Sequence, residues 1–521
     1  MMREEDTIMA LLRNVNLSIE TSLKSISEMM GSARQAQKTW ALVPFSSRKI
    51  YLDKMLSYIL EHADEIVETL CRDTGKTRSD AMADEIIPCA FACKWYGENA
   101  ESVLQDKMLK TSIPLMLNKK SLITRIPLGV VGIISPWNYP LSIPFGEVLM
   151  GLMAGNAVIL KTSYEVTPNI GTLISKIISS SGLPEGLFYS VEIPGPEFSE
   201  ALFASGIDKI FFTGSVRVGK ELMRKASETL TPLSLELGGN DPMLVFEDAD
   251  LERASNGAIW GAYQNAGQTC AGIERVYVHE KIYESFVNLL AEKTRHLKHG
   301  SYKDENVDMG AITTEKQLAT ITLHVEEALK KGAKILAQSQ AVGELKGHFF
   351  PATLIVDVNH SMMIMNEETF GPILCVMKFN DEAQAIELAN KSQYALTSSV
   401  WTKDLEKGKR VGRLLESGVT TINDHLLTHG FSETPWGGWK QSGIGRTHGA
   451  IGLEEMTHCK VLNWDLLPSK RNLYWYPGGS QSYQNLKKAL SLSFERNPLK
   501  FLGLSAKFLP VALKKIFRSD P

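Results

Sequence analysis

The sequence predicts an α/β protein in which a doubly wound, Rossmann-like parallel sheet is followed by a second α/β domain. Two patterns support this fold class. From Val130 onward, short apolar runs rich in β-branched residues alternate with stretches of helical periodicity, which is the order of strand–helix–strand units. A second alternating series begins after Gly239. The first ~105 residues instead read as helices with charged outer faces, since Pro and Gly are sparse there.

Local patterns indicate each element of the first series. Val130–Ile134 is too short for a helix and rich in β-branched side chains, so it reads as a buried strand. One helix is marked at both ends: Thr167 suits an N-cap, Pro168 the first helical position and Gly182 the residue past the last turn. The other strands are Ala157–Lys161, Leu187–Ile193 and Lys209–Thr213, and the other helices are Pro144–Ala154 and Val216–Glu228.

The second series supplies five more strands, with helices between several of them. No unit of 20–50 residues repeats in the chain, which argues against a solenoid. In chain order the strands are Met243–Phe246, Arg275–His279, Ile373–Phe379, Ser398–Trp401 and Val419–Ile422.

The composition is ordinary for a soluble globular protein. The chain has 521 residues, 44% of them apolar and 22% charged, so we expect two or more domains with a full-sized core. A net charge of -3 argues against a nucleic-acid partner, because a phosphate backbone requires a basic face. The 6 cysteines have neither disulfide-framework nor CxxC spacing, which indicates free thiols, a cytoplasmic location and no metal site.

Two segments bear on membrane insertion. The acidic run Glu4–Asp6 stands where a secretory signal would be basic, and apolar residues in Ile8–Val15 recur at helical spacing, so we expect an amphipathic helix there. Residues Ile126–Gly146 carry no charge and are long enough to cross a bilayer. They contain four prolines, however, and match a buried strand followed by a loop better than a membrane span.

The last ~50 residues form a basic amphipathic tail. From Asn485 to Pro521, eight Lys or Arg stand against two acidic residues, Glu495 and Asp520, and large apolar side chains are interleaved with them. Such a segment suits an anionic membrane surface. It suits equally well a helix packed on the protein's own surface with its Lys side chains in water, so both alternatives stay open.

Two residues have the types that covalent catalysis needs. Cys270 stands in Gly-Gln-Thr-Cys-Ala-Gly, and Glu236 stands 34 positions earlier in Leu-Glu-Leu-Gly-Gly. A free thiol is a strong nucleophile even when only a few per cent is ionised. Burial beside Leu235 and Leu237 would raise the pKa of a carboxyl group toward that of a general base. We therefore take Cys270 as the candidate nucleophile and Glu236 as the candidate base.

Two turns at strand ends are candidate ligand sites. Two prolines fix the turn in Ser135–Pro140, where the Asn138 amide could donate to an oxyanion or bond only its own backbone. A second strand runs into Gly214 and Ser215 at a helix N-terminus, which lets a phosphate approach, although an ordinary tight turn has the same pattern. It lacks the GxGxxG spacing. The glycines in Gly443–Gly449 come close to that spacing but read as a structural loop.

Taken together, five motifs resemble those of the NAD(P)-dependent aldehyde dehydrogenase superfamily. The likeness runs from about residue 30 to residue 470 in the family's order and with matching spacing, which is a highly specific pattern. The motifs are Pro136–Pro140, Phe212–Ser215, Glu236–Gly239, Gly267–Gly272 and Glu368–Pro372.

The resemblance implies catalytic roles for three residues. Cys270 would attack the aldehyde carbonyl, and Asn138 together with the Cys270 backbone N–H would hold the oxyanion of the resulting thiohemiacetal. Hydride transfer to a nicotinamide would leave a thioester, and Glu236 would activate the water that hydrolyses it. The implied cofactor is NAD or NADP, and the implied cofactor-binding residues are Trp137, Lys161, Gly214, Ser215, Glu368 and Phe370.

This sequence departs from the family pattern beside two of these residues. The loop after Lys161 is one residue longer than usual, so the ribose-binding carboxylate is expected at Glu165, with Tyr164 at the standard offset. A carboxylate there favours NAD, because it repels a 2′-phosphate. Glu147 stands where many members have Lys. This chain therefore lacks the lysine whose positive charge could help to ionise Cys270.

The resemblance also implies a β oligomerisation arm and the domain boundaries. The arm, around Thr111–Arg125 and Lys460–Trp464, implies a homodimer or a homotetramer. The expected parts are an NAD-binding domain of residues 1–110 and 128–238, a catalytic domain of residues 239–440, the arm with its return to the first domain at residues 111–127 and 441–470, and the tail at residues 471–521.

The leading interpretation is an NAD-dependent aldehyde dehydrogenase that makes a carboxylate. One alternative passes the acyl group to coenzyme A, against which the presence of Glu236 argues. Another is a nucleotide-binding or membrane-tethered protein without activity, against which the intact catalytic set argues. The tail favours a long-chain or lipophilic aldehyde as substrate. Trp260, Tyr263 and Trp436 could line an entry tunnel or belong to the core.

Overall fold

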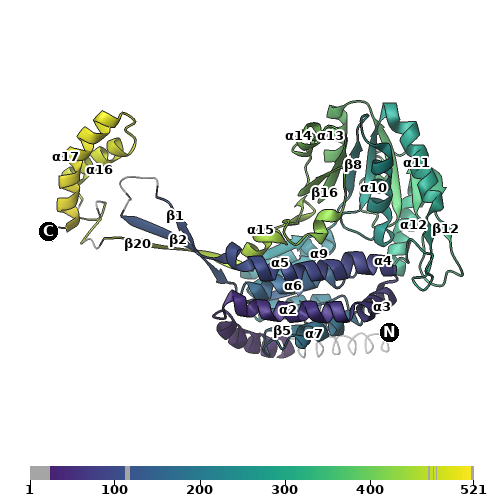
Figure 1. Ribbon diagram of the computed structural model, residues 1–521, viewed down its shortest axis with the longest axis horizontal. Coiled ribbons are helices and arrows are strands. Elements are labelled where there is room, and N and C mark those ends of the chain that lie inside the picture. Colours follow the sequence, from purple (N-terminus) through teal and green to yellow (C-terminus); the bar gives the residue numbers. More distant parts are fainter. Residues whose placement is uncertain are drawn as a thin grey trace, which may run out of the picture. The chain divides into compact units, whose positions relative to one another are not determined.

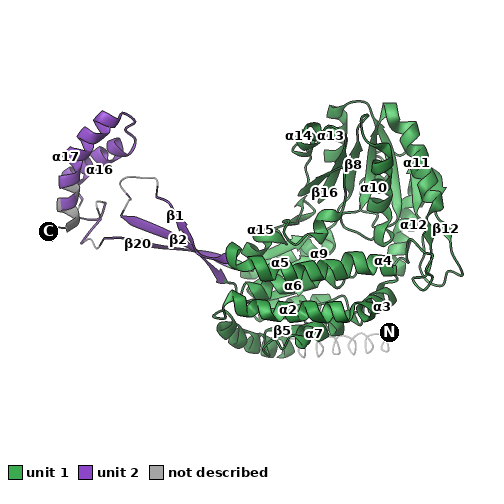
Figure 2. Cartoon of the chain, in the orientation of Figure 1, with its two compact units in different colours: residues 1–103, 127–457 green, residues 104–126, 458–521 purple. Residues whose placement is uncertain are grey.

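The chain is represented by a computed structural model that describes residues 24–111, 116, 118–467, 470–472, 474–476 and 478–517. It divides into two compact units, residues 1–103 with 127–457 and residues 104–126 with 458–521 (Figure 2). The helix expected over Ile8–Val15 lies outside the described residues. The predicted α/β fold class is confirmed, because helices alternate with the strands of two sheets in the first unit (Figure 1).

The described chain opens with helices, as its low content of Pro and Gly predicts. A helix over residues 24–40 buries Ile26, Met30 and Ala33. Another helix ends at Gly75, whose φ of 78° is a common helix stop. The following helices are α2 Phe45–Glu61, α3 Ala63–Thr74, α4 Arg78–Ala81 and α5 Ile87–Leu104, with a π-helical turn over Met82–Ile86 between the last two.

The first sheet has six strands in the order β19-β7-β6-β3-β4-β5. β3 and β4 are parallel and wholly buried, which explains why both read as unbroken apolar runs. The strand order reverses between β3 and β6, and ligands bind beyond the carboxyl ends of the strands at such a point. The strands are β3 Val130–Ile134, β4 Ala157–Lys161, β5 Phe188–Val191, β6 Lys209–Thr213, β7 Leu233–Glu236 and β19 Gly443–Ile444, and the helices are α6 Ser142–Met153, α7 Ile170–Ser180, α8 Gly195–Ala204 and α9 Val216–Thr229.

The start of α7 corrects the prediction. α7 begins at Ile170, two residues after Pro168. Thr167 is not its N-cap, because the Thr167 hydroxyl donates to the Ser163 carbonyl within the preceding turn. The side chain that looked like a cap therefore stabilises the turn instead of the helix.

The start of α6 depends on a distant side chain. The helix begins at Ser142, two residues before the predicted start at Pro144. Glu85, on the π-helical turn, accepts hydrogen bonds from the backbone N–H groups of Leu141 and Ser142. A carboxylate is favourable at a helix N-terminus, and this one comes from a different part of the chain.

The second sheet has seven strands in the order β11-β13-β14-β9-β8-β16-β17. All five predicted strands of this series are present with boundaries within two residues, and the sheet is parallel except for β11 at its edge. The strands are β8 Asp241–Val245, β9 Ile273–His279, β11 Lys334–Gln338, β13 Thr353–Val356, β14 Ile373–Phe379, β16 Thr397–Trp401 and β17 Val419–Ile422. The helices are α10 Leu251–Tyr263, α11 Tyr283–His296, α12 Glu315–Lys330, α13 Glu382–Asn390 and α14 Leu405–Gly412.

Short elements complete the first unit. Both large sheets lie in this one unit, and the domain boundaries expected above stay predictions. The Gly443–Gly449 run is structural, as expected: Gly443 pairs with Glu236 between β19 and β7, and its φ is 150°. The remaining elements are β10 Lys298–His299, β12 Gln340–Ala341, β15 Tyr394–Ala395, β18 Trp439–Lys440 and α15 Gly449–Glu455.

The second unit consists of a three-stranded sheet and two helices. β1 Lys107–Leu109 pairs antiparallel with β2 Lys119–Pro127, and β20 Thr457–Asp465 lies on the other side of β2. α16 Ser480–Ser493 and α17 Pro498–Phe517 pack against each other. Among the described helices, none combines the length and the apolar character that crossing a bilayer requires. Ile126–Gly146 forms the end of β2, then β3, a turn and the start of α6.

Candidate active site

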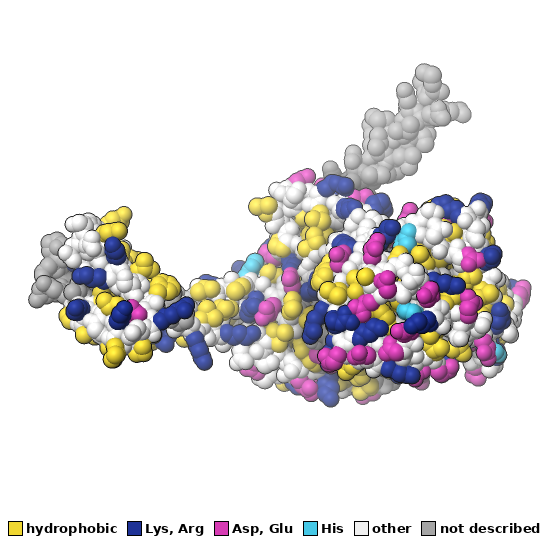
Figure 3. All heavy atoms as spheres, turned by 90° about the horizontal axis from the view of Figure 1, so that it is seen from above, with side chains coloured by type: hydrophobic (Ala, Val, Ile, Leu, Met, Phe, Trp, Pro, Cys, Tyr) yellow, Lys and Arg dark blue, Asp and Glu magenta, His cyan; other side chains and the backbone are white. Residues whose placement is uncertain are grey.

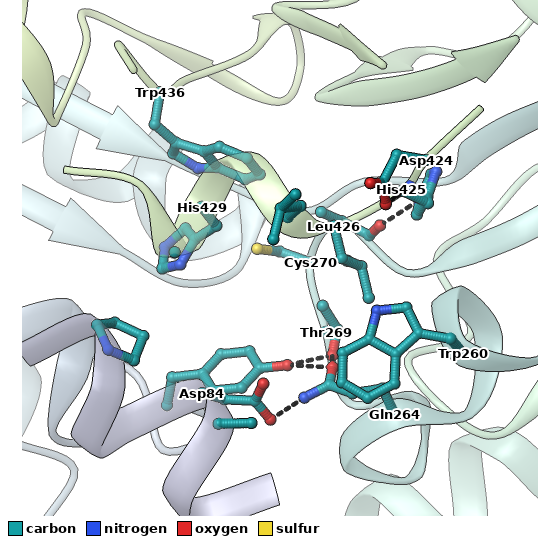
Figure 4. Close-up of a pocket in the computed structure, with 16 residues that line it drawn as sticks. Asp84, Trp260, Gln264, Thr269, Cys270, Asp424, His425, Leu426, His429 and Trp436 are labelled. Atoms are coloured by element: carbon teal, nitrogen blue, oxygen red, sulfur yellow. Dashed lines mark hydrogen bonds between the residues drawn. The ribbon is translucent and has the colours of Figure 1, made fainter. Parts of the chain in front are cut away.

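Cys270 lies in a strained loop between α10 and β9. Asn265 and Ala266 have positive φ angles of 53° and 54°, and Gly267 follows with 68°. A side chain at Gly267 is excluded, because its Cβ would lie 2.1 Å from the Gly371 carbonyl oxygen. Residues in such conformations cost roughly 1–3 kcal/mol each and persist where the surrounding structure holds them. The strain immediately precedes the thiol, whose sulfur points into a cavity (Figure 4).

Asn138 is held directly against this loop. Its side-chain amide donates to the Gln268 carbonyl over 3.0 Å. Its own carbonyl accepts from the Asn265 amide over 3.1 Å. These two contacts link the turn after β3 to the Cys270 loop, so the amide lies near the thiol although the two residues are distant in sequence.

A buried ion pair holds the Asn138 turn in place. It was not predicted from the sequence. Lys76 Nζ lies 2.6 Å from Glu85 Oε1, and both side chains are almost fully buried. The same Nζ donates to the Asn138 carbonyl over 3.0 Å. Lys76 lies in the short connection between α3 and α4, and Glu85 lies on the π-helical turn. Each stands among other charged residues in the sequence, so no local signal distinguishes the pair.

Glu236 is the last residue of β7 and is buried. Neither of its carboxylate oxygens accepts a hydrogen bond from a described residue. Burial raises its pKa well above the ordinary value, and the nearby Glu147 carboxylate raises it further, whereas Arg446 lowers it. The predicted burial of this carboxyl group is confirmed. Because its pKa is raised, Glu236 can act as a base only at a pH that is high enough to ionise it.

The Cys270 thiol has a higher pKa than the thiol of a free cysteine. Burial raises its pKa most, and the negative charges of Glu368, Asp241 and Glu236 raise it further. The expectation that a few per cent is thiolate at neutral pH is therefore too high for this environment. Attack on a carbonyl requires a base that removes the thiol proton.

A cleft of about 420 Å³ lies at the switch point of the first sheet. Six of the seven predicted cofactor residues line it, and Cys270 and Glu236 border it as well. Ser215 caps α9 there by accepting from the Val218 N–H, so the helix N-terminus faces the cleft as a pyrophosphate site requires. The predicted residues at the cleft are Trp137, Lys161, Gly214, Ser215, Glu368 and Phe370.

The inner part of this cleft fits a nicotinamide ribose. Trp137 and Phe370 are in edge-to-face contact with ring centroids 5.6 Å apart. Glu368 accepts from the Gly239 N–H over 3.0 Å. A side chain at Gly238 would meet the Glu368 carboxylate at 2.2 Å, so the glycine leaves room for this acceptor. Glu368 supplies carboxyl oxygens that can accept hydrogen bonds from ribose hydroxyls, and the two aromatic rings supply apolar surface beside it.

Glu165 is the one predicted cofactor residue that is not among the residues lining this cleft. It forms an ion pair with Lys161, with 3.1 Å between Nζ and the closer oxygen. The Lys161 ammonium also lies 5.2 Å from the ring centroid of Tyr164. Although the loop after Lys161 is longer than usual, the Glu165 carboxylate therefore still lies beside Lys161, the other residue expected to bind ribose.

A tunnel of about 330 Å³ leads to Cys270 from the other side (Figure 4). Trp260 and Trp436 line it together with Tyr139, Leu426 and His429, so the structure decides between the two alternatives left open for these tryptophans. Trp260 is 45% exposed and marks the outer end. Tyr263 is not part of the lining but belongs to the core under the second sheet, so only two of the three aromatic candidates contribute.

The ionisable groups of the tunnel are largely uncharged near neutral pH. Burial lowers the pKa of His425 and of His429 to about 4, so both imidazoles are neutral. Burial, reinforced by Asp80, raises the pKa of Asp84 to about 8, and Gln264 donates to this carboxyl group. Among the described residues that line the tunnel, none is Lys or Arg. Asp424 also lines the tunnel and accepts a hydrogen bond from the His425 backbone N–H. The described walls therefore have no cation that would attract an anionic substrate, and they suit neutral and apolar molecules better.

The predicted catalytic residues converge where three cavities meet. Cys270 borders the cleft, the tunnel and a third pocket that also contains Glu236. Among the described residues no cluster of three or more His, Cys, Asp or Glu could hold a metal ion. All six cysteines are free thiols, and Cys270 is the one at this junction.

Comparisons with known proteins agree with this geometry. The family model described as the aldehyde dehydrogenase family matches residues 17–462. The chain is 38% identical over 473 residues to the 4,4'-diapolycopene aldehyde oxidase of a Methylomonas species, across 90% of this chain and 87% of the relative. It is 34% identical to the succinate semialdehyde dehydrogenase of Acinetobacter baylyi, across 82% of this chain and 87% of the relative. The NAD+ complex of an aldehyde dehydrogenase from Bacillus cereus superposes with a TM-score of 0.80 at 33% identity, covering 85% of this chain and 89% of that one.

Proposed function

Because this chain belongs to the aldehyde dehydrogenase family and is an NAD(P)-dependent enzyme, we propose that it oxidises lipophilic aldehydes to carboxylic acids with NAD, through a covalent adduct on Cys270. One observation carries the proposal: Cys270 stands where a cofactor cleft, a neutral tunnel and the Glu236 pocket meet. A thiol at such a junction can be reached by aldehyde, cofactor and water from separate directions.

In the first step the Cys270 sulfur forms a bond to the aldehyde carbon. The thiol proton passes to Glu236, which borders the same pocket. The carbonyl oxygen becomes an oxyanion, and the Asn138 amide is held within reach by its bond to Gln268. One oxyanion donor of this kind contributes about 10²–10³ in rate.

In the second step the adduct loses hydride and becomes a thioester on Cys270. The oxidised nicotinamide, when bound, supplies the hydride acceptor. Trp137 and Phe370 confine the inner cleft, and the Glu368 carboxyl group, held by the Gly239 N–H, would accept from ribose hydroxyls. NAD is favoured over NADP, because Glu165 places a carboxylate beside Lys161, and Lys161 lines the cleft.

Before the third step Glu236 releases to solvent the proton that it took from the thiol. In the third step it deprotonates water, which attacks the thioester; the carbon–sulfur bond breaks with its electron pair going to sulfur, and the acid is released. The alternative acceptor, coenzyme A, needs no such base, so the buried and unpaired carboxylate of Glu236 favours hydrolysis. A product assay distinguishes the two: acyl-CoA in place of free acid, with coenzyme A present, would contradict this proposal.

The substrate class follows from the charges of the tunnel. An aldehyde that carries its own carboxylate would need Lys or Arg, and none of the described lining residues is either. Trp260 and Trp436 supply apolar surface instead. The relative from Methylomonas is named a 4,4'-diapolycopene aldehyde oxidase, whereas the relative from Acinetobacter baylyi is named for succinate semialdehyde, so the lipophilic substrate is proposed on the tunnel lining alone.

Removing the outer aromatic wall is the corresponding test. Trp260→Ala is expected to lower kcat/KM for decanal about tenfold, since about 1.4 kcal/mol of lost burial is a factor of ten. Acetaldehyde, which does not reach Trp260, should be unaffected. Trp439→Ala is the matched control, because Trp439 is 47% exposed and is not part of the described lining. Equal losses for both aldehydes, or faster turnover of succinate semialdehyde than of decanal by the unmodified enzyme, would reject the assignment.

We further propose that the enzyme is a homodimer or homotetramer built on β1, β2 and β20, and that α16 and α17 rest on an anionic membrane surface. The two helices bury Asn485, Ala489 and Phe508. They leave a second apolar set exposed: Leu486, Leu490, Leu499, Leu502, Leu509 and Leu513. Neither helix contains Asp or Glu, and Lys and Arg lie beside the apolar side chains (Figure 3). This combination is typical of helices that lie in a membrane interface.

Vesicle binding tests the role of these helices. A protein ending at residue 470 should no longer sediment with phosphatidylglycerol vesicles and should lose activity on long-chain aldehydes but not on acetaldehyde. Lys500→Glu with Lys507→Glu should weaken vesicle binding at least about tenfold, since each lysine near an anionic surface contributes about 1 kcal/mol. Lys330→Glu with Lys346→Glu, at two exposed lysines of the first unit, is the charge-matched control. Unchanged vesicle binding after truncation would instead support packing on the protein's own surface or on a second copy.

A further inference from the structure

A third, very small pocket lies beside the thiol. It has a volume of about 20 Å³ and is bordered by Cys270, Glu236 and Glu147. A cavity needs roughly 10–15 Å³ measured in this way to hold one water molecule, together with two or more polar partners. This pocket therefore has the size for a single water and carboxylates to hold it.

Both carboxylates are buried with unpaired oxygens. Glu236 is 5% exposed and Glu147 2% exposed. Both oxygens of Glu236 and Oε2 of Glu147 accept no hydrogen bond from a described residue. Leaving such groups unpaired is expensive, and native structures retain them where they have a function or a bound water. Glu147 comes from α6 and Glu236 from β7, so the pairing depends on how helix and sheet pack.

We propose that Glu147 is the second carboxylate of the hydrolytic site: together with Glu236 it holds the attacking water in this pocket, and it receives the proton that Glu236 removes. The inference rests on the proposed function, because it assigns a role within thioester hydrolysis. It adds a residue whose type is unusual for the family at this position, where many members have Lys.

The proposed step is balanced as follows. The water oxygen forms a bond to the acyl carbon of the Cys270 thioester, and the carbon–sulfur bond breaks with the electron pair going to sulfur. One water proton passes to Glu236 and then to Glu147, and the other stays on the carboxylic acid product. No oxidant or reductant takes part in this step.

The charges around the pair agree with one proton held between two carboxylates. Burial raises the pKa of Glu147 to about 8. Arg446 lowers the pKa of Glu236, and the Glu147 charge raises the pKa of the nearby Tyr96. His429 and His448, which also line this pocket, are neutral, with pKa values that burial lowers to about 4 and about 3. Two carboxylates sharing a poorly solvated site rarely ionise together.

Glu147→Gln is the decisive variant, measured in the full-length enzyme. We expect the first NADH of each subunit to form as a burst within twofold of the normal rate, followed by turnover about 10- to 100-fold slower, because Glu236 remains as the base and only part of the roughly 10²–10⁴ from general-base assistance is lost. The acid limb of the kcat–pH profile should move to lower pH, because removal of the neighbouring carboxylate lowers the pKa of Glu236. Glu147→Asp should restore part of the turnover, and Ser142→Ala on the same helix should leave both phases unchanged.

Hydrolysis of p-nitrophenyl acetate provides a second measurement without cofactor. This ester acylates the thiol directly, so release of acetate from wild-type enzyme reports the hydrolytic step alone. Its rate should rise with pH through the region near 8, where Glu147 ionises. A single limb near the ordinary carboxyl value of 4.5, or Glu147→Gln with unchanged turnover and unchanged pH profile, would overturn the inference. Failure of the wild-type enzyme to form NADH from any aldehyde would instead reject the proposed function.

Discussion

Replacing Cys270 by alanine should reduce NADH formation by about 10⁵–10⁶, the loss typical of removing a covalent nucleophile. The reason is geometric as well as chemical. The sulfur points into the tunnel while it borders the cofactor cleft, and no other described cysteine lines either cavity. Since Ala removes only one heavy atom, NAD binding to Cys270→Ala should be unchanged in a calorimetric titration, which separates loss of chemistry from loss of the cleft.

Mass spectrometry gives an independent readout of the same assignment. After a decanal and NAD quench in acid, the acyl group should reside on the peptide that contains Cys270. Cys459→Ala is the appropriate control, because Cys459 is exposed on β20 and away from the described cavities. Acylation of a different residue, or undiminished turnover by Cys270→Ala, would show that the nucleophile is wrongly assigned.

Replacing Glu236 by glutamine should stop the cycle after the thioester forms. The amide retains the shape of the side chain but cannot accept a proton, so hydrolysis should slow by about 10²–10⁴. The thiol would still be acylated if hydroxide or another base takes its proton, and a stable acyl-enzyme should then accumulate. Stopped-flow absorbance should show at most one NADH per subunit, followed by almost no turnover.

Hydroxylamine provides the control for this prediction. It attacks a thioester without help from a base and should restart turnover of Glu236→Gln while yielding a hydroxamate. A variant that had lost its fold or its cofactor cleft would not respond. If Glu236→Gln instead shows no burst, the carboxylate acts mainly in removing the thiol proton, which is plausible given how strongly burial raises the pKa of Cys270. Normal steady-state turnover would reject a role for Glu236 in either step.

Short-range patterns predicted the elements well. Val130–Ile134, Ala157–Lys161 and Lys209–Thr213 are strands with the predicted bounds. They are buried on both faces, so their apolar and β-branched composition reports the final environment directly. The start of α7 was misplaced, because Thr167 has two possible partners and the sequence does not show which one it takes.

The candidate site likewise contains residues that the sequence predicted and residues that it did not. Cys270, Glu236 and Asn138 were identified through motifs, and the structure brings them together, with Asn138 joined to the Cys270 loop through Gln268. The Lys76–Glu85 pair beneath Asn138 was not predicted, since its function arises only from the buried contact. Tyr263 shows the reverse case, as an aromatic residue near the site in sequence that belongs to the core.

By itself the sequence determined the α/β class, the order of the strands along the chain and the chemical types of the catalytic side chains, because these depend on residue identity and on periodicity over a few positions. Only the tertiary structure decided that Glu147 faces Glu236, that the Asp84 carboxyl group is neutral in the tunnel and that Trp260 lines it. Burial and like-charge proximity set these properties, and both arise from contacts between segments that are far apart in the chain.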